Sequence, residues 1–248
     1  DNQTSYLTGA FTGSLIGSDG TKSYAIYDLK KPLFDTLNGA AVRDLDLKNT
    51  QVDSKENAAA VAKTANNANI SNVAVEGKVS GRKSVAGLVV DATNTRIENS
   101  SFSGKLIANH ADNNANYAGG IVGKLTGGNA KVDKSKVDAV ISTAARNNNQ
   151  TAGGIVGKLE SGALVTRSVT TGKILNGQGY PRVGGIVGST YPRGRVDNVV
   201  SNMNVGDGYA TTGDQFGSAD VKNAITSVEN KKQDNFVRKV TKEEVDAK

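Results

Sequence analysis

The chain has 248 residues and a net charge of +6, with 29 glycines, 3 prolines, no cysteine and no tryptophan. The missing cysteines exclude a disulfide framework, a thiolate nucleophile and a cysteine metal site. The 30 Lys and Arg residues form no dense run beside a nucleic-acid motif, and no apolar run of about 18 residues predicts membrane insertion. Apolar positions filled by small and β-branched residues favour many short, closely stacked strands, and therefore an all-β fold.

Three regions follow one another along the chain. We predict an N-terminal cap or first coil over residues 1–30, which hold much of the aromatic content and protect an open strand edge. Residues 31–230 carry repeats, and residues 231–248 are predicted to be a linker and the start of a helix, since Thr241-Lys-Glu-Glu244 is a capping box. The first residues lack the features of a signal peptide, so we expect the targeting signals outside this segment.

A glycine phrase, Gly-Gly-Ile-Val-Gly, occurs three times, within residues 118–125, 152–159 and 183–188. The copies start 34 and 31 residues apart. A phrase that recurs at such intervals is typical of stacked supersecondary units, and we interpret it as one strand of each unit. The structural glycines assigned to the phrase are Gly119, Gly120, Gly123, Gly153, Gly154, Gly157, Gly184, Gly185 and Gly188.

The Ile-Val pair inside the phrase places an apolar side chain on each of the two faces of that strand. A strand in a single-layer coil turns only one of two neighbouring side chains inward. We therefore expect an outward stripe of Val122, Val156 and Val187, which is either lightly exposed beside the glycines or covered by another segment. If that stripe is exposed, it is a candidate docking surface.

A second repeat consists of an anchor residue followed by small or apolar residues three, five, seven and nine positions later. Steps of two are strand alternation, whereas the odd step of three places a corner directly after the anchor. Asn and Asp tolerate the left-handed backbone conformation that such a corner needs. The anchors are Val42, Ile70, Ile97, Val132, Val165 and Val196. The corner residues of the expected type are Asp44, Asn72, Asn99, Asn198 and Asn223, whereas Lys134 and Arg167 occupy two further corners.

Anchors spaced by 27 to 35 residues without helical periodicity are typical of coils that hydrogen-bond to one another. The predicted fold is a right-handed parallel β-helix, a solenoid of six to seven coils, with an N-terminal cap and a short C-terminal helix. Three polar loops, at residues 109–116, 144–151 and 177–182, are expected to project from one edge of the rod.

A doubled Tyr-Pro-Arg sequence is the candidate partner-binding feature. Tyr and Arg are common interface anchors, and Pro stiffens the loops that present them. The alternative is a pair of ordinary loop turns with stacked Tyr and Arg side chains. The candidate residues are Tyr180, Arg182, Tyr191, Arg193 and Arg195.

No catalytic or metal-binding residue is assigned to the chain. The glycine phrase does not fit a phosphate loop, because Ala118 replaces its first glycine and Leu125 its Ser or Thr. Glu98 and Asp133 are predicted neighbours on successive coils and would suit the carboxylate pair of a carbohydrate-active enzyme, with two solvated turn residues as the alternative. His110, the single histidine, lies in an Asn-rich loop without a second ligand.

The glycine phrase with its following Ile/Val-x-Asn corner resembles the GLUG repeat. Phe11-Thr-Gly13, Pro32-Leu-Phe34 and Gly39-Ala-Ala-Val42 resemble the preceding region of the streptococcal zinc metalloproteases that include immunoglobulin A1 protease (peptidase family M26). The resemblance implies a secreted or cell-wall-associated endopeptidase, a virulence factor, whose His-Glu-x-x-His zinc site lies in a separate C-terminal domain. With one histidine, this chain carries neither that zinc pair nor its catalytic Glu.

The resemblance leads us to expect a noncatalytic module that engages the substrate, or spaces the domains, of a zinc metalloendopeptidase. Zinc is expected in the catalytic domain of the parent protein and not in this segment. The implied partners are a host glycoprotein, immunoglobulin A1 first, and other domains of the same protease, without nucleic acid and without membrane insertion. An adhesin-like or glycan-binding surface module and a polysaccharide lyase or hydrolase are the alternatives.

Overall fold

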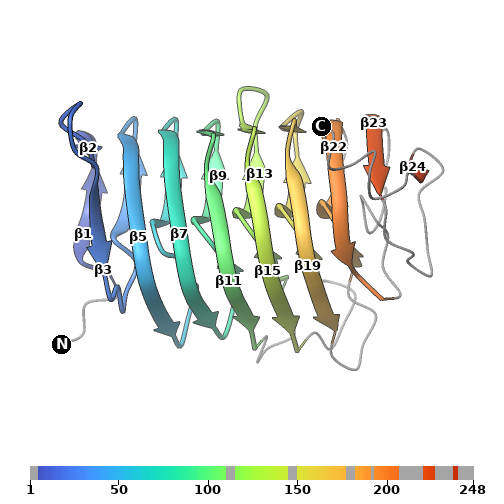
Figure 1. Cartoon of the computed structure of the whole chain (residues 1–248), viewed down its shortest axis with the longest axis horizontal. Coiled ribbons are helices and arrows are strands. Elements are labelled where there is room, and N and C mark those ends of the chain that lie inside the picture. Colours follow the sequence, from blue (N-terminus) through green and yellow to red (C-terminus); the bar gives the residue numbers. More distant parts are fainter. Residues whose placement is uncertain are drawn as a thin grey trace.

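The computed structural model describes residues 5–109, 115–144, 150–176, 182–190, 193–206, 220–226 and 237–239. These residues form a solenoid whose turns stack along its long axis (Figure 1). All the strand pairs of the described part run parallel, and they build sheets of seven, thirteen and four strands. The predicted all-β parallel β-helix is confirmed, and seven strands in the first sheet match six to seven coils. The predicted C-terminal helix lies outside the described residues.

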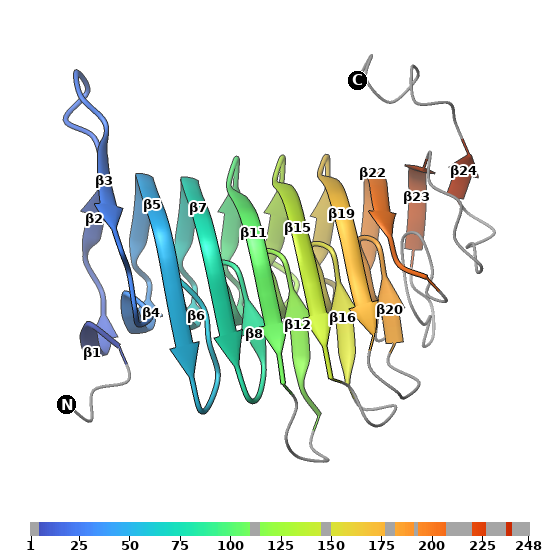
Figure 2. The same cartoon turned by 60° about the horizontal axis from the view of Figure 1, so that its bottom comes forward.

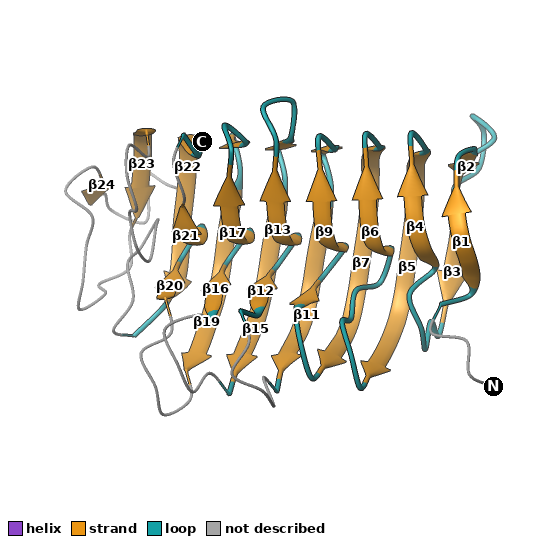
Figure 3. Cartoon of the chain, turned by 180° about the vertical axis from the view of Figure 1, so that it is seen from behind, coloured by secondary structure: helices purple, strands orange, loops and turns teal. Residues whose placement is uncertain are grey.

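The seven-stranded sheet receives one short strand from each turn and faces the viewer in Figure 3. From β4 onward each of its strands begins with a buried apolar residue whose counterpart in the next turn is its register partner, as Val89 is for Val122. In spatial order the strands are β1 (Leu7–Phe11), β4 (Phe34–Asn38), β6 (Ala62–Asn66), β9 (Val89–Thr93), β13 (Val122–Thr126), β17 (Val156–Glu160) and β21 (Val187–Thr190).

The thirteen-stranded sheet contains the anchor residues and the strands after the corners. In some turns one long strand runs through the corner, and in others two strands flank it. The long strands are β5 (Ala41–Ser54), β7 (Asn69–Gly81), β22 (Arg195–Asn204) and β23 (Asp220–Thr226). The flanking pairs are β10 (Arg96–Glu98) with β11 (Ser101–Ala108), β14 (Lys131–Asp133) with β15 (Lys136–Thr143), and β18 (Leu164–Thr166) with β19 (Val169–Asn176). The end strands are β2 (Ser14–Ile16), β3 (Tyr24–Tyr27) and β24 (Val237–Lys239).

The four-stranded sheet belongs only to the later turns. Figure 2 shows its strands side by side, next to the long strands of the thirteen-stranded sheet. Within the described residues it begins at β8, so the turns before β8 have two sheets and the turns after it have three. Its strands are β8 (Val85–Ala86), β12 (Tyr117–Gly119), β16 (Thr151–Gly153) and β20 (Arg182–Gly184).

The corner residues share a left-handed backbone conformation, with φ between 46° and 56°. Two of them are linked across turns, because Asn72 Nδ2 donates a hydrogen bond to Asp44 Oδ1 over 2.9 Å. Lys134 and Arg167 adopt the same conformation although their side chains do not favour it. The fold thus imposes the left-handed conformation at every described corner, and the residue type changes only the free energy that this conformation costs. The set is Asp44, Asn72, Asn99, Lys134, Arg167, Asn198 and Asn223.

At three of the corners a buried serine pairs with backbone groups that the corner leaves without a ladder partner. Ser100 is buried one residue after its corner, where it accepts a hydrogen bond from Val73 N and donates one to Glu98 O. Ser168 does the same between Ser135 N and the carbonyl of Thr166. Because an unpaired buried backbone group costs about 1–3 kcal/mol, these hydrogen bonds explain how a polar side chain is accepted at an inward position that is apolar at the other corners.

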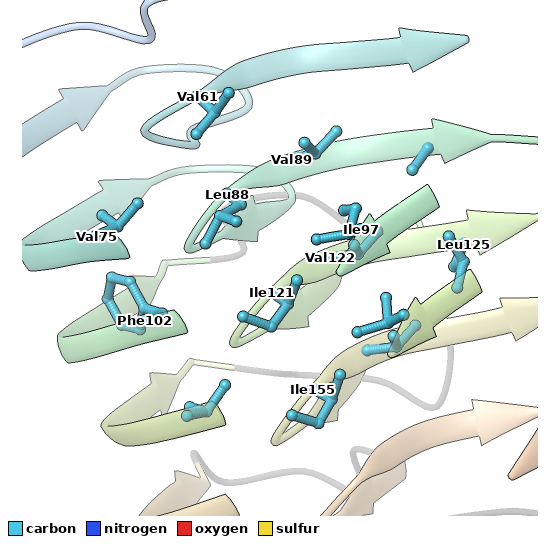
Figure 4. Close-up of a cluster of buried hydrophobic side chains, with 14 of the residues drawn as sticks. Val61, Val75, Leu88, Val89, Ile97, Phe102, Ile121, Val122, Leu125 and Ile155 are labelled. Atoms are coloured by element: carbon cyan, nitrogen blue, oxygen red, sulfur yellow. The ribbon is translucent and has the colours of Figure 1, made fainter. Parts of the chain in front are cut away.

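The interior is filled by ladders in which one apolar side chain per turn stacks on its counterpart. Figure 4 shows Leu88, Ile121 and Ile155 at equivalent places of successive turns, all fully buried. Phe102 enters the same interior from the opposite sheet and packs where Gly87 leaves room for its ring. The core is therefore continuous along the rod, and each turn depends on the turns beside it.

The prediction that the glycine phrase is one strand is wrong. The chain bends at Gly120 and Ile121, so the phrase contributes one strand to the four-stranded sheet and another to the seven-stranded sheet. After the bend both Ile121 and Val122 point inward, and each is 0% exposed. The expected outward valine stripe does not exist, since Val156 and Val187 are also fully buried. A docking surface made of these valines is excluded.

Glycine allows the two sheets joined by this bend to pack backbone against backbone. A Cβ atom on Gly119 of β12 would lie 1.9 Å from Val122 O and 2.8 Å from the nitrogen of Gly157. One turn further on, a Cβ on Gly153 would lie 2.6 Å from the nitrogen of Gly188. No other residue fits at such distances, so the turns of β12, β16 and β20 need glycine at these positions, whereas the turn of β8 has Ala86 in place of Gly119.

The two ends of the described rod differ. Strands β1, β2 and β3 form the first turn and pair with β4 and β5. Large apolar side chains are exposed on this turn, among them Leu7, Ile16 and Tyr27. At the other end β23 continues the sheet beyond β22, and Asn223 occupies its corner. None of the described segments is an apolar helix of membrane-spanning length.

Candidate functional site

The candidate site lies on the outer face of the seven-stranded sheet, beside the edge of the four-stranded sheet. Two outward positions of each strand form rows there, because parallel register places equivalent residues about 4.8 Å apart. Asp91, Lys124 and Lys158 form one row, on β9, β13 and β17. Thr93, Thr126 and Glu160 form the second row, two residues further along the same strands. We call these six residues the polar rows.

Ion pairs connect the polar rows. Glu160 accepts salt bridges from Lys158 at 2.7 Å and from Lys124 at 3.4 Å, and the hydroxyl of Thr126 donates a hydrogen bond to it at 3.0 Å. Burial pushes the pKa of Glu160 up, but these partners outweigh burial and hold the pKa below its usual value. Glu160 therefore stays ionised and keeps both lysine side chains in fixed positions.

Two residues of the four-stranded sheet reach the polar rows. The ring of Tyr117 on β12 lies under the Lys158 ammonium, 5.5 Å from nitrogen to ring centre, which is a cation–π distance. Burial lowers the pKa of Lys158, the hydrogen bond to Glu160 raises it, and the nearby charge of Arg182 lowers it, with a net upward shift. Arg182, predicted from the sequence to bind a partner, therefore lies close to Lys158 and adds positive charge to this face.

A pocket of about 250 Å³ opens over the polar rows and is lined by Asp91, Ala92, Thr93, Lys124 and Thr126. Burial raises the pKa of Asp91, and the charge of Lys124 opposes that shift only in part. The pocket thus presents a carboxyl group, an ammonium group and two hydroxyl groups, which together accept and donate hydrogen bonds.

The other predicted partner-binding residues do not join this site. Arg182 opens β20, whereas Arg193 follows β21 at a φ of 73° and Arg195 opens β22. Strands β20 and β21 run between them across the width of the rod (Figure 3). The structure therefore separates Arg182 from Arg193 and Arg195. Tyr180 and Tyr191 lie outside the described residues.

Glu98 and Asp133 are register partners on β10 and β14, as the sequence predicts. Asp133 is 4% exposed and is engaged by Arg167, whose Nε donates to Oδ1 at 2.8 Å, and by Lys131 at 2.8 Å. Burial raises the pKa of Asp133, but the hydrogen bonds from Arg167 and Lys131 dominate and leave the pKa lowered. A carboxylate held in this way is a structural part of the corner, which does not favour a catalytic pair.

No metal centre can be assembled from the described side chains, since no three of their His, Cys, Asp and Glu groups lie together. His110 falls outside the described residues, and the chain has no second histidine and no cysteine to join it. These donors do not fit a zinc ion.

Sequence reasoning missed the polar rows, although a signal was present. Lys124 and Lys158 follow the last glycine of two copies of the phrase, which the sequence analysis compared only with a phosphate loop. Aligning the copies also with residues 86–90 places Asp91 at the same position. The site could have been found by noticing that aligned repeats have an ionisable residue at this same position.

Comparison with known proteins gives consistent matches. The profile of the M26 IgA1-specific metallo-endopeptidase N-terminal region matches residues 1–77. Over 248 residues, all of the chain, it is 73% identical to zinc metalloprotease ZmpC of Streptococcus pneumoniae serotype 4. Over 97% of its length it is 43% identical to immunoglobulin A1 protease of Streptococcus sanguinis. A solved structure of an IgA1 protease matches 99% of the chain with a TM-score of 0.86 and 33% identity.

These relatives are much longer than the chain. It spans 13% of the length of each of the two curated relatives and 21% of the solved chain. The similarity therefore concerns one region of large proteins, and it extends over nearly the whole length of this chain.

Proposed function

Because this chain belongs to the N-terminal part of the IgA1-protease-type zinc metalloproteases, we propose that it is a noncatalytic module that engages the substrate of such an enzyme. The observation that carries the proposal is the cluster of Lys124, Lys158 and Arg182 on the outside of rigid strands, beside a polar pocket. Charged groups fixed in this way favour recognition and orientation of a partner rather than bond cleavage. We place the parent protein at the bacterial surface, secreted or bound to the cell wall.

The noncatalytic role is supported by the side chains available. Zinc peptidase chemistry needs a metal held by several His, Cys or carboxylate ligands, and the described residues offer no such group. We therefore assign the zinc ion to a catalytic domain outside this chain, and no step of the proposed function passes through it.

The proposed partner is a host glycoprotein, with immunoglobulin A1 as the first candidate. Support comes from relatives named immunoglobulin A1 protease, of which the Streptococcus sanguinis protein is 43% identical to this chain. The relative with 73% identity is named only a zinc metalloprotease. The choice of immunoglobulin A1 therefore rests on family membership and needs a direct binding test.

The test is binding of the 248-residue chain to immobilised immunoglobulin A1, with two double variants that remove the same charge at different places. Arg182→Ala with Lys158→Met removes charge from the site, and we expect at least about tenfold weaker binding, equivalent to about 1.4 kcal/mol. Arg193→Ala with Arg195→Ala removes equal charge at the far end of β20–β21 and is expected to leave affinity within about twofold. Thermal melting of both variants checks their folding.

Equal losses in the two double variants would contradict this site and indicate nonspecific attraction by net charge. No binding of the unaltered chain, together with undiminished cleavage by a parent protease that lacks it, would overturn substrate engagement. The remaining role would then be that of a spacer between domains.

A further inference from the structure

We infer that the pocket between β9 and β13 binds one neutral hexose unit of a glycan, through Asp91, Thr93, Lys124 and Thr126. The inference deepens the proposed function and rests on it, since it names the part of a host glycoprotein that the outer face would hold. Three properties of the pocket support it: its size, its balance of charge and its rigidity.

Size limits the ligand to a small group. A volume of about 250 Å³ is below the roughly 300–1,000 Å³ of pockets for drug-sized ligands, yet it far exceeds the roughly 10–15 Å³ that a cavity needs to hold one water molecule. A single sugar ring falls in this interval, whereas a folded peptide segment does not. The pocket is open to solvent on the outer face, so a longer glycan can continue beyond the bound unit.

Charge limits the ligand to a neutral one. Asp91 and Lys124 are register partners, and both line the pocket. An anionic ligand on Lys124 would meet the Asp91 carboxyl, and a cationic ligand on Asp91 would meet the ammonium, so either charge is opposed at about strand spacing. Neighbouring hydroxyl groups of a sugar instead bridge the pair, donating to the carboxyl and accepting from the ammonium.

The framework holds these groups in place before any ligand arrives. Lys124 is tied to Glu160 at 3.4 Å, and the hydroxyl of Thr126 donates to the same carboxylate at 3.0 Å. All four polar side chains stand on β9 and β13, which pair in register along the solenoid. Because little side-chain freedom is lost on binding, a small polar ligand can be bound measurably despite its few contacts.

The experiment is saturation-transfer NMR on the 248-residue chain with galactose, N-acetylgalactosamine, mannose and glucose, and with sialic acid as an anionic probe. We expect transfer to at least one neutral sugar and none above background to sialic acid. The double variant Asp91→Leu/Lys124→Met should reduce that transfer at least about tenfold. Thr93→Val, an isosteric change at an exposed side chain, should reduce it about threefold even if the double variant is poorly folded.

The matched control is Asp35→Asn with Lys63→Met, which removes an ion pair on the same sheet outside the pocket. It should leave the transfer unchanged. Transfer to no neutral sugar, transfer to sialic acid alone, or equal transfer in Thr93→Val and the control would each overturn the pocket assignment.

Removal of the glycans from immunoglobulin A1 separates this inference from the proposed function. Binding that depends on glycans and on Thr93 supports both. Binding that survives deglycosylation supports the substrate-engaging module and overturns the sugar pocket. If the intact glycoprotein does not bind but a neutral sugar does, the pocket stands, the protease-substrate role fails, and a glycan-binding surface module replaces it.

Discussion

The early and later turns of the solenoid solve the same packing problem in different ways. In the early turns the outward position at the kink of the seven-stranded sheet is polar, with Asp35 and Lys63 paired across neighbouring strands. In the later turns the equivalent positions are Gly123, Gly157 and Gly188, and the four-stranded sheet lies directly over them. The four-stranded sheet can therefore pack against the seven-stranded sheet only because the residues at this position of β13, β17 and β21 have no side chain.

β9 marks the transition between the two regions. Val90 occupies the kink position there, and it packs with Ala59 and Ala86 in a small cluster apart from the main core. The short strand β8 covers it, so a valine and an alanine fill the space that glycine backbones close in the following turns. The polar pocket lies at this transition, because Asp91 follows Val90 and lines the pocket together with its register partner Lys124.

The comparison predicts its largest effect at a glycine beneath the added sheet. A Cβ atom in Gly153→Ala would lie 1.9 Å from Val156 O, so backbone must move and stability should fall by about 3 kcal/mol or more. Gly128→Ala is the matched control, since no atom lies within 4 Å of its added Cβ. We expect urea unfolding to shift strongly for the first variant and by less than about 0.5 kcal/mol for the second. Similar midpoints would refute backbone-to-backbone packing.

The corners also differ between the early and later turns. Asp or Asn occupies the early corners, whereas Lys or Arg occupies two of the later ones. Arg167 compensates by binding Asp133, so Asp133→Asn should cost about 1.5–3 kcal/mol at neutral pH. Asp133 has a lowered pKa in the folded chain, so its stabilisation is present above the unfolded value near 3.9 and is lost as pH falls through the folded pKa.

Unfolding measured from pH 7 down to pH 2 checks this. The difference between the unaltered chain and Asp133→Asn should shrink as pH drops below about 4. Asp138→Asn, on the exposed face of β15, serves as the control and should differ little from the unaltered chain at any pH. A pH-independent effect of Asp133→Asn would mean that its charge is not what stabilises the corner.

In the early turns the corner depends on the side chain of Asn72 itself. Asn72→Ala removes a residue that tolerates a φ of 53° and deletes its hydrogen bond to Asp44. The expected loss is about 1–2 kcal/mol, from the cost of the left-handed conformation for alanine. Thermal unfolding beside Asn69→Ala, an exposed change at the start of the same strand, measures it. Equal effects would show that the corner is indifferent to residue type.

Much of the fold could be predicted from the sequence because its signals are local. Alternation by two places Leu45 and Leu47 inward, and a residue such as Asn99 marks a left-handed corner within its own turn. The bend at Gly120 was missed because two short strands and one longer strand have the same glycine-rich sequence. Only the clash of a Cβ on Gly119 with a neighbouring backbone distinguishes them.

The candidate site was harder to predict because it depends on contacts between turns. Lys124 belongs to the site because it lies beside Asp91, 33 residues earlier, and Glu160, 36 residues later. Only the stacking of successive turns brings these three residues together. The Tyr-Pro-Arg copies look equivalent in the sequence, yet the width of the rod separates Arg182 from Arg193. Sequence similarity between loops does not place them on one face.

The smallest expected effect is a gain in stability at a later corner. Lys134 has a φ of 48° and an exposed side chain, and Asn at this place would regain up to about 1 kcal/mol of the left-handed penalty. Lys136→Asn is the charge-matched control, because that exposed lysine starts β15 in an extended conformation and should gain nothing. Thermal unfolding should therefore rise for Lys134→Asn only. If both variants gain equally, the loss of positive charge is responsible, and the early and later corners do not differ in the way inferred from their residue types.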